Sequence, residues 1–296
     1  MLREALAIGR FVLGHPIGRR RPLRCLFDVA RWQLTAGSEP RVVPFAGDAR
    51  LLARRGETGV SGNIYVGLHE FADMAFVVHA LRPGDLFGDI GANAGSYTVL
   101  AARLAQASVV AVEPVAETAE RLQANVELNG IADRVELHRV AVSDRAGTVR
   151  FTIDADTVNR IAGQNDAQRP TREVPCTTLD ALFGERVPAV LKIDVEGHEG
   201  PVLEGARRLL RASGLLALVV EEGSGFGLSP DSGPVHRILQ EHGFAPATYD
   251  PWRRRFDPAE QPSGGHRGNV LWLRDRVELE RRVREAPPIL VKGLQV

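Results

Sequence analysis

The feature that most constrains the fold of this chain is a regular alternation of apolar runs with amphipathic segments, which begins near residue 85. The pattern predicts strands at 85–90, 108–114, 134–142, 188–197 and 214–222, with helices at 95–106, 115–129 and 198–211 between them. Most of these strands are apolar on both faces, which is typical of a mostly parallel sheet covered by helices. The predicted fold class is therefore α/β.

Two regions depart from this alternation. Between Thr148 and Thr178, short alternating segments predict a hairpin-like insertion with a loop near 163–170. Towards the end of the chain, a predicted helix at 233–242 precedes the stretches FAPATY and NVLWL, which predict two closing strands. These two strands could form an antiparallel edge of the sheet.

Composition limits the remaining possibilities. The chain has 296 residues, of which 44% are hydrophobic, so it can bury a core without disulfides or a structural metal. Acidic and basic residues balance at 37 each, which argues against a nucleic-acid partner. No apolar run reaches the roughly 18 residues of a membrane span. In the first residues the arginine cluster follows the apolar stretch, which is the reverse of the order in a signal peptide. We therefore expect a cytoplasmic protein with no transmembrane segment.

The beginning of the chain has a different character from the rest. Residues 1–55 contain eleven arginines and only four acidic residues. A solvated helical face is the favoured interpretation, and contact with an anionic membrane or an acidic partner is the alternative. We expect 1–60 to be a helical or irregular appendage, 61–276 to be the main domain, and 277–296 to be a C-terminal helix or tail.

The sharpest motif is DIGANAGSY at 89–97, which follows a predicted strand and opens a predicted helix. In open α/β sheets, ligands bind at the carboxyl ends of strands, where a helix N-terminus presents free N–H groups. Gly91 and Gly95 allow a tight turn and a close approach of a ligand to the backbone. The next strand ends in Glu113, whose carboxylate can accept hydrogen bonds from a ribose diol. This pattern predicts a cofactor site, and a purely structural turn is the alternative.

The residue at position 93 separates the two cofactors that use such a turn. A dinucleotide requires G-x-G-x-x-G, because its second glycine lets the pyrophosphate approach the backbone, and that position here is Asn93. S-adenosylmethionine has no phosphate, and it needs polar groups for its amino-acid end and a carboxylate for its ribose. Asp89, Asn93 and Glu113 suit those needs, so the sequence favours S-adenosylmethionine over a nicotinamide cofactor.

A set of motifs in this order resembles the FkbM-type S-adenosylmethionine-dependent methyltransferases. The motifs are DIGANAGSY, VVAVEP, NVELNG at 125–130, VAVSD at 140–144 and LKIDVEGHEGPVLEGA at 191–206, and the most specific segment among them is KIDVEG. The similarity extends from about Asn63 to Leu273. It implies a Rossmann-like class I methyltransferase fold, a seven-stranded, mostly parallel sheet with helices on both faces and an antiparallel last strand. It also implies O-methylation of sugars or secondary-metabolite hydroxyls.

The resemblance further implies which residues hold S-adenosylmethionine. Residues of the glycine turn would line its methionine part, Glu113 would bind the ribose, and residues after the third strand would lie near the adenine. The full set is Asp89, Gly91, Ala92, Asn93, Gly95, Glu113, Pro114, Ala141, Val142 and Asp144. For Asp144, initiation of a turn in SDRAG is an equally favoured interpretation.

A second polar cluster ends the strand at 188–197. Lys192 and Asp194 share one face of this strand, because side chains alternate, and a buried charge requires a partner. A purely structural Lys–Asp pair is therefore one interpretation. The other is that Asp194 lies at the carboxyl edge, facing the transferred methyl group. For Glu199, a solvated helix face is favoured.

Methyl transfer to an alcohol also requires removal of a proton. His198 is a natural candidate for the base, and Asp194 or Glu196 could take the proton or orient the hydroxyl, so these three are the catalytic candidates. Asp194, Glu196 and Glu222, or Glu221 in place of Glu222, could instead bind Mg²⁺ through oxygen ligands. The sequence leaves the metal question open.

The leading hypothesis is an S-adenosylmethionine-dependent O-methyltransferase acting on a small-molecule hydroxyl, such as that of a sugar, a glycan precursor or a secondary metabolite. The alternatives are a methyltransferase acting on RNA or protein, a nicotinamide-dependent oxidoreductase, and a binding module without catalysis. The arginine-rich PWRRRF at 251–256 is interpreted as a loop over the active site or a surface turn. A homo-oligomer is compatible with the sequence.

Overall fold

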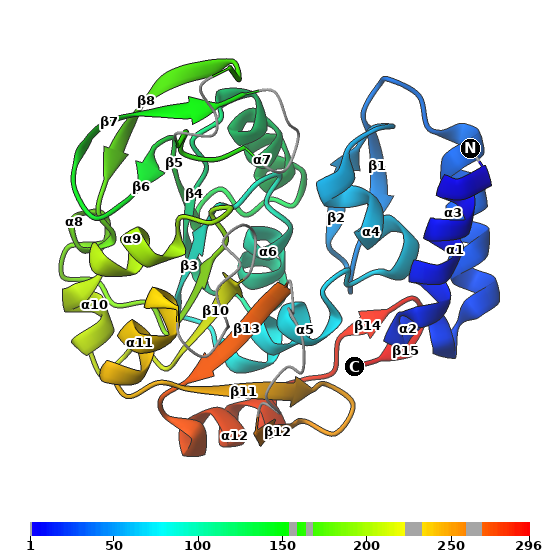
Figure 1. The fold of residues 1–296 in the computed structure, drawn as a ribbon. Helices are drawn as coiled ribbons and strands as arrows, with labels where there is room; N and C mark the ends of the chain where they lie inside the picture. The colour runs from blue at the N-terminus through cyan, green and yellow to red at the C-terminus, as the bar shows by residue number, and fades with distance from the viewer. Residues whose placement is uncertain (1, 154–158, 164–167, 223–232, 259–267) are drawn as a thin grey trace.

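A large twisted sheet organises the molecule (Figure 1). The computed structural model describes residues 2–153, 159–163, 168–222, 233–258 and 268–296. Within these residues the large sheet has eight strands in the order β12-β11-β13-β10-β9-β3-β4-β5. The strands are β3 (Leu86–Ile90), β4 (Ser108–Val112), β5 (Val135–His138), β9 (Val190–Ile193), β10 (Ala217–Glu222), β11 (Ala245–Asp250), β12 (Arg255–Pro258) and β13 (Gly268–Leu273).

The strand directions confirm the predicted α/β class. β10, β9, β3, β4 and β5 run parallel, and the late strand β13 lies antiparallel between β10 and β11. The expected seven strands are one too few, because β12 pairs antiparallel with β11 and adds an eighth at the edge. The PWRRRF segment makes the turn that joins β11 to β12, so its arginines stand at the sheet edge.

Helices cover both faces of this sheet, because its strands are buried on both sides. Phe87 and Ile90 of β3 belong to different hydrophobic cores, as expected for side chains that alternate across a strand. One core is covered by α5 (Phe71–Ala80), α6 (Ser96–Val99), the π-helical turn η1 (Leu100–Leu104), α7 (Ala116–Leu128) and α12 (Arg276–Glu285). The other is covered by α8 (Leu179–Phe183), α9 (Glu199–Glu204), α10 (Arg207–Arg211) and α11 (Pro234–Glu241).

Two predicted elements are divided in the structure. The strand expected at 134–142 becomes β5 and the short β6 (Ala141–Val142), which joins a second sheet with β7 (Gly147–Thr152) and β8 (Thr171–Thr177). β7 and β8 form the expected antiparallel hairpin, and the loop predicted near 163–170 lies partly outside the described residues. The helix expected after β9 breaks at Gly205, where a Cβ would lie 2.2 Å from the carbonyl oxygen of Ser143.

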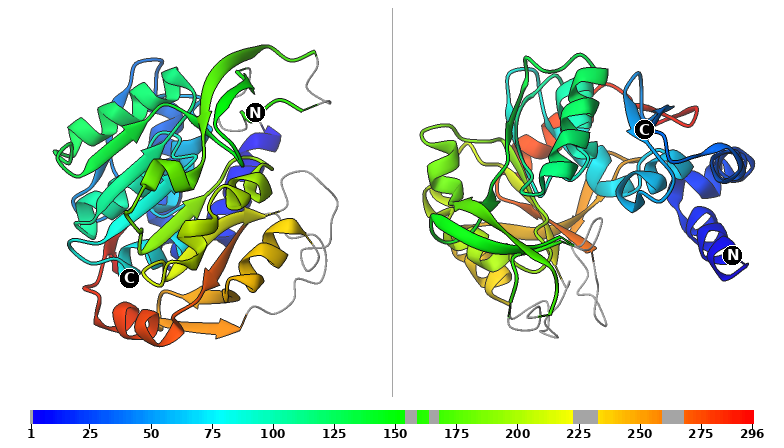
Figure 2. Two further views of the ribbon diagram at one scale, coloured as in Figure 1. Left: turned by 90° about the vertical axis from the view of Figure 1, so that its left-hand side faces the viewer. Right: turned by 90° about the horizontal axis from the view of Figure 1, so that it is seen from above.

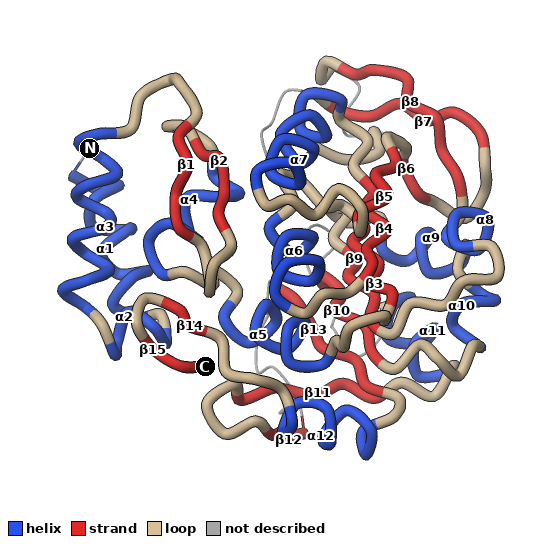
Figure 3. Tube along the Cα trace, turned by 180° about the vertical axis from the view of Figure 1, so that it is seen from behind, coloured by secondary structure: helices blue, strands red, loops and turns tan. Residues whose placement is uncertain are grey.

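The N-terminal segment lies beside the large sheet rather than in it (Figure 3). It comprises α1 (Leu2–Gly14), α2 (Pro16–Arg20), α3 (Pro22–Thr35), β1 (Arg41–Pro44), β2 (Arg50–Ala53) and α4 (Thr58–Val66). The boundary expected at residues 60 and 61 falls inside α4, whose sequence TGVSGNIYV carries little helical periodicity. None of the helices in the described ranges combines the length and apolar character needed to cross a membrane.

Asn125 of α7 and Asn129, which caps the end of α7, attach this segment to the rest of the protein. The side chain of Asn125 accepts a hydrogen bond from the Leu52 N–H (2.7 Å) and donates one to the carbonyl of Ala94 (2.8 Å). Asn129 accepts from the Arg50 N–H (2.9 Å) and donates to the Arg50 carbonyl (2.7 Å). The two side chains thus form hydrogen bonds with the backbone groups at the free edge of β2, as a neighbouring strand would.

The C-terminal end of the chain returns to the N-terminal helices. The short hairpin of β14 (Leu290–Val291) and β15 (Leu294–Gln295) carries Lys292, whose Nζ lies 2.7 Å from the Asp28 carboxylate of α3. Both side chains are largely buried, so the contact ties the tail to α3. This contact joins the C-terminal hairpin to the N-terminal helices, and Figure 1 shows the hairpin beside α2.

Candidate active site

A cavity of about 320 Å³ opens where the carboxyl ends of β3, β4 and β9 meet. This is the position at which ligands bind in open α/β sheets, and the volume lies within the range of small-molecule sites. The glycine turn and the end of β4 form one part of its wall, and the loop after β9 forms another. Phe151 and Ile161, which face each other across the insertion hairpin, also line it.

The glycine turn is held tightly between the strands. Gly91 has a φ of +78°, and a Cβ at this position would lie 1.8 Å from the carbonyl oxygen of Asp194. The N–H groups of Gly91 and Ala92 both donate to the carbonyl of Val112. Asn93 also has a positive φ of 49°, and its side chain accepts from the Ala94 N–H at 2.7 Å. Contacts within the protein therefore hold the backbone of the turn in place.

Glu113 lies at the end of β4 and faces this turn. One of its carboxylate oxygens accepts from the Asn93 N–H at 3.0 Å, and the other accepts from the Val115 N–H at 2.9 Å. Burial raises the pKa of Glu113 to about 7, although these two hydrogen bonds oppose the rise. Each carboxylate oxygen has more than one acceptor position, so the group can still receive the two hydroxyls of a ribose.

Most of the residues predicted to hold the cofactor reach the wall of the cavity. These are Gly91, Ala92, Asn93, Glu113, Pro114, Ala141 and Val142. Asp89 lies behind the wall, fully buried, and accepts from the Thr98 hydroxyl at 2.6 Å. Gly95 adopts a left-handed conformation at the start of α6, packed on Leu122. Asp144 accepts from the Ser143 hydroxyl and lines a separate cavity of about 240 Å³.

The acidic cluster after β9 forms the opposite part of the wall. Lys192 Nζ donates to the Asp194 carboxylate at 2.9 Å, so the structural pairing considered from the sequence is present. Burial alone would lower the pKa of Lys192, but the carboxylates of Asp194, Asp89 and Glu70 raise it above its usual value. Lys192 is therefore charged, and both Lys192 and Asp194 also line the cavity.

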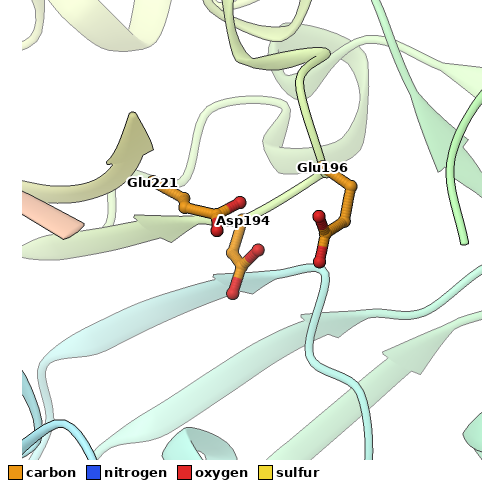
Figure 4. A group of neighbouring side chains, drawn as sticks. All are labelled: Asp194, Glu196 and Glu221. Carbon is orange, nitrogen blue, oxygen red and sulfur yellow. The ribbon is translucent and has the colours of Figure 1, made fainter. Parts of the chain in front are cut away.

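Three carboxylates meet at this point. Asp194, Glu196 and Glu221 each offer an oxygen within 4.8 Å of the others (Figure 4). Burial, and then the charge of Asp194, raises the pKa of Glu196 to about 7. Burial and the charges of Asp194 and Glu196 raise that of Glu221 to about 8. Near neutral pH Glu221 is therefore mainly protonated and Glu196 is partly protonated.

The structure corrects two expectations for neighbouring acids. Glu222 does not join the three carboxylates, because it accepts from the Trp272 indole N–H at 2.9 Å. Residues 221 and 222 point to opposite faces of β10, and Glu221 shares the face of Val219, which pairs with Lys192. Glu199 is buried rather than solvated, since its carboxylate accepts from the N–H groups of Val195 and Gly197, both at 3.1 Å.

His198 lines the cavity, but one of its ring nitrogens is already occupied. Its Nε2 lies 2.8 Å from the Ser143 hydroxyl. Burial lowers the pKa of His198, and the charge of Asp144 opposes this only in part. The imidazole is therefore neutral near pH 7, and its contact with Ser143 joins the loop after β9 to the end of β6.

Glu70 and Tyr97 are polar residues of the wall to which the sequence-based prediction gives no role. Glu70 precedes α5 and receives a hydrogen bond from the Asn269 side chain at 2.8 Å. Tyr97 of α6 is buried beneath Lys192, whose Nζ lies 5.0 Å from the centre of its ring. Tyr97 belongs to the glycine motif, so it could have been named as a candidate site residue from the sequence. No sequence signal places Glu70 at the cavity.

Comparisons with known proteins agree with this geometry. Residues 89–246 match the family model described as the methyltransferase FkbM domain. The 31-O-demethyl-FK506 methyltransferase FkbM of Streptomyces tacrolimicus is 39% identical over 172 residues. That alignment covers 46% of this chain and 65% of the relative, so the chain spans just under two thirds of the relative's length.

Solved structures with a similar fold include two methyltransferases. The methyltransferase FkbM of Methylobacillus flagellatus is 14% identical, with a TM-score of 0.41 over 64% of this chain and 43% of that one. A SAM-dependent O-methyltransferase of Thermotoga maritima is 16% identical, with a TM-score of 0.40 over 68% and 64% of the two chains.

The strand order, with β13 antiparallel among parallel strands, and the cavity at the glycine turn define the class I methyltransferase fold. The family match covers more than half of the residues and includes both the glycine turn and the acidic cluster. The chain belongs to the FkbM methyltransferase family. S-adenosylmethionine is the cofactor that this family implies, and the residues of the glycine turn and Glu113 fit it.

Proposed function

We propose that the protein transfers the methyl group of S-adenosylmethionine to a hydroxyl group of a small molecule. The observation that carries the proposal is a single cavity that joins Asn93 and Glu113 at one side to Asp194 and Glu196 at the other. The first pair suits the amino-acid and ribose parts of the cofactor, and the second suits an acceptor hydroxyl. The O-methyltransferase activity of the Streptomyces relative is consistent with this assignment.

When bound, the cofactor supplies an electrophilic methyl group on a sulfonium. The protein then has to position the acceptor oxygen and remove its proton. Asp194 is suited to orient the hydroxyl, because its charge is held in place by Lys192 at 2.9 Å. Glu196, with a pKa of about 7, is suited to accept the proton near neutral pH and to share it with Glu221.

The charges around the cavity limit the acceptor. Glu70, Asp194 and Glu196 line its wall near Lys192, so carboxylates outnumber this ammonium group. An anionic acceptor, such as a sugar phosphate, would be repelled, whereas a neutral or cationic molecule with several hydroxyls would find acceptors for its hydrogen bonds. We therefore propose a sugar or a hydroxylated secondary metabolite without negative charge.

The same carboxylates leave a metal-assisted version of the reaction as the alternative. Asp194, Glu196 and Glu221 are oxygen ligands of the kind that Mg²⁺ prefers, and a bound cation would lower the pKa of the hydroxyl. Turnover that stops with a chelator and returns with Mg²⁺ would support this version. Indifference to both would support proton transfer to Glu196 without a metal.

Transfer of a labelled methyl group to a panel of neutral, cationic and phosphorylated sugars and of hydroxylated metabolites tests the activity. On the acceptor found, Asp194→Asn should lower turnover by about 10²–10⁴-fold while S-adenosylhomocysteine still binds. Glu204→Gln is a suitable control, because Glu204 lies on the nearby α9 and pairs with the exposed Arg207. Near-normal turnover of Asp194→Asn would refute the assigned role.

We further propose that the N-terminal segment is part of the catalytic unit built on residues 61–276. Gly59 of this segment lines the cavity, and Asn125 joins Leu52 of β2 to the glycine turn. Deletion of residues 1–53 should therefore weaken S-adenosylhomocysteine binding. Unchanged affinity in the shortened chain would show that the segment is a separable appendage.

A further inference from the structure

The outer face of α3 carries an apolar stripe that nothing in the described part of the chain covers. Leu23, Phe27, Ala30 and Leu34 follow one another at helical spacing, and all four are exposed. The exposed fractions of Leu23, Phe27 and Leu34 are 83%, 61% and 85%. The opposite face of the helix buries Cys25, Asp28 and Trp32, so α3 already packs on the protein through its other side.

This exposure is concentrated in one part of the molecule. Of the ten exposed large apolar side chains in the described ranges, six lie on α3 and the neighbouring α1. Figures 1 and 2 place both helices at the outer edge, away from the large sheet. Exposed apolar groups gathered in this way mark a surface that contacts another body.

Two arginines flank the stripe, and others are exposed elsewhere on the N-terminal helices. Arg24 and Arg31 flank it on α3, and the other exposed arginines of the three N-terminal helices are Arg10, Arg19, Arg20 and Arg21. Among the described side chains of residues 5–35, the only acidic one is Asp28, which is buried and paired with Lys292 and with Arg24. The surface is therefore apolar, with exposed arginines and no exposed acidic side chain among these residues.

We propose that the α1–α3 surface binds the face of an anionic phospholipid bilayer. Leucine and phenylalanine on one side of a helix, flanked by arginines, is the pattern of helices that lie in the membrane interface. Arginines near anionic headgroups add electrostatic attraction, while Leu23, Phe27 and Leu34 enter the boundary with the acyl chains.

The charges argue against a second copy of this chain as the occupant. Two α3 helices packed stripe to stripe would bring Arg24 and Arg31 of one chain against those of the other, without an exposed acid to pair with them. A bilayer also needs no complementary groove, and α3 presents a convex helical face. An acidic protein is the remaining occupant, and the experiment separates it from lipid.

The test is co-sedimentation of the full chain with vesicles of phosphatidylglycerol and phosphatidylcholine, compared with phosphatidylcholine alone. We expect binding only to the anionic vesicles, and a loss of affinity at high salt. Phe27→Ser and Leu34→Ser should each weaken binding by about tenfold. Arg24→Gln and Arg31→Gln should each weaken it by about fivefold.

Two control variants separate this surface from general effects. Val277→Ser removes a side chain that is 82% exposed on α12, and Arg211→Gln removes an exposed arginine of α10. Neither should change vesicle binding, and thermal unfolding should show that every variant remains folded.

Three results would overturn the proposal. The first is no binding to anionic vesicles, which would leave a protein as the occupant. The second is binding that Phe27→Ser and Leu34→Ser leave unchanged. The third is a dimer in sedimentation velocity that Phe27→Ser dissociates, because a second copy would then cover the stripe.

Discussion

Replacing Glu113 by glutamine should separate cofactor binding from stability. The carboxylate accepts from the N–H groups of Asn93 and Val115, and an amide can accept only one of these bonds, which costs about 1–3 kcal/mol. Against this, burial raises the pKa of Glu113 to about 7, so its charge destabilises the folded protein by up to roughly 3 kcal/mol above that pH. At pH 8 the two effects offset, and the free energy of unfolding should change by less than about 1 kcal/mol.

The affinity for S-adenosylhomocysteine should nevertheless fall at pH 8. Glu113→Gln removes charge-assisted bonds to the two ribose hydroxyls, which contribute about 1–3 kcal/mol. Calorimetric titration measures this loss, and urea unfolding of the free protein measures the stability. Glu117→Gln, at an exposed position in the first turn of α7, is the matched control and should change neither quantity.

Two results would refute this reasoning. Unchanged affinity of Glu113→Gln would show that the ribose is held elsewhere. A loss of more than about 3 kcal/mol of stability at pH 8 would show that Glu113 serves mainly to hold the glycine turn, because the loss would exceed that of one hydrogen bond.

Three further predictions concern stability and the binding of S-adenosylhomocysteine. The pKa of Glu221 in the folded protein is about 8, above its ordinary value of 4.5. The contribution of Glu221 to stability is therefore complete below about pH 4.5 and is lost as the pH rises through 8. Glu221→Gln should flatten the fall in melting temperature between pH 5 and pH 9. In Asn125→Asp the side chain can still accept a hydrogen bond from β2 but can no longer donate one to the glycine turn. Urea unfolding should therefore show a loss of about 1–3 kcal/mol in the free energy of unfolding, and Asn125→Ala should lose more. Gly91→Ala should abolish S-adenosylhomocysteine binding in calorimetry, because its Cβ would meet the Asp194 carbonyl. The control Gly84→Ala, with φ of +88° and open space around it, should only lower stability by about 1 kcal/mol. Equal effects of the two substitutions would refute the steric argument.

The order of strands and helices could be predicted because it depends on local periodicity. The runs around Asp89, Glu113 and Asp194 each carry their own pattern, and parallel strands bring their carboxyl ends to one edge. Strand alternation places Glu221 and Glu222 on opposite faces, but only the register of β10 with β9 shows that Glu221 shares the face of Lys192.

Other features depend on contacts between distant segments, which no local pattern records. β12 forms because the turn at Arg254 folds back on β11, and Arg254 itself donates to the carbonyls of Val283 and Ala286. Glu70 lines the cavity, where Asn269, about 200 residues later in the chain, donates a hydrogen bond to its carboxylate. Such residues become visible only in the folded chain.

The contact between Gly91 and the Asp194 carbonyl has a consequence for redesign of this protein. Backbone meets backbone there, with no side chain between the glycine turn and the acidic loop, so there is no side chain to shorten, and one added at Gly91 would collide with the Asp194 carbonyl. Anyone wishing to retarget the enzyme to a larger acceptor would gain nothing at this junction. The adjustable walls are those built by side chains, namely Glu70 before α5 and Phe151 and Ile161 of the insertion hairpin, where a library of substitutions can widen the chamber and leave the distance between the two loops intact.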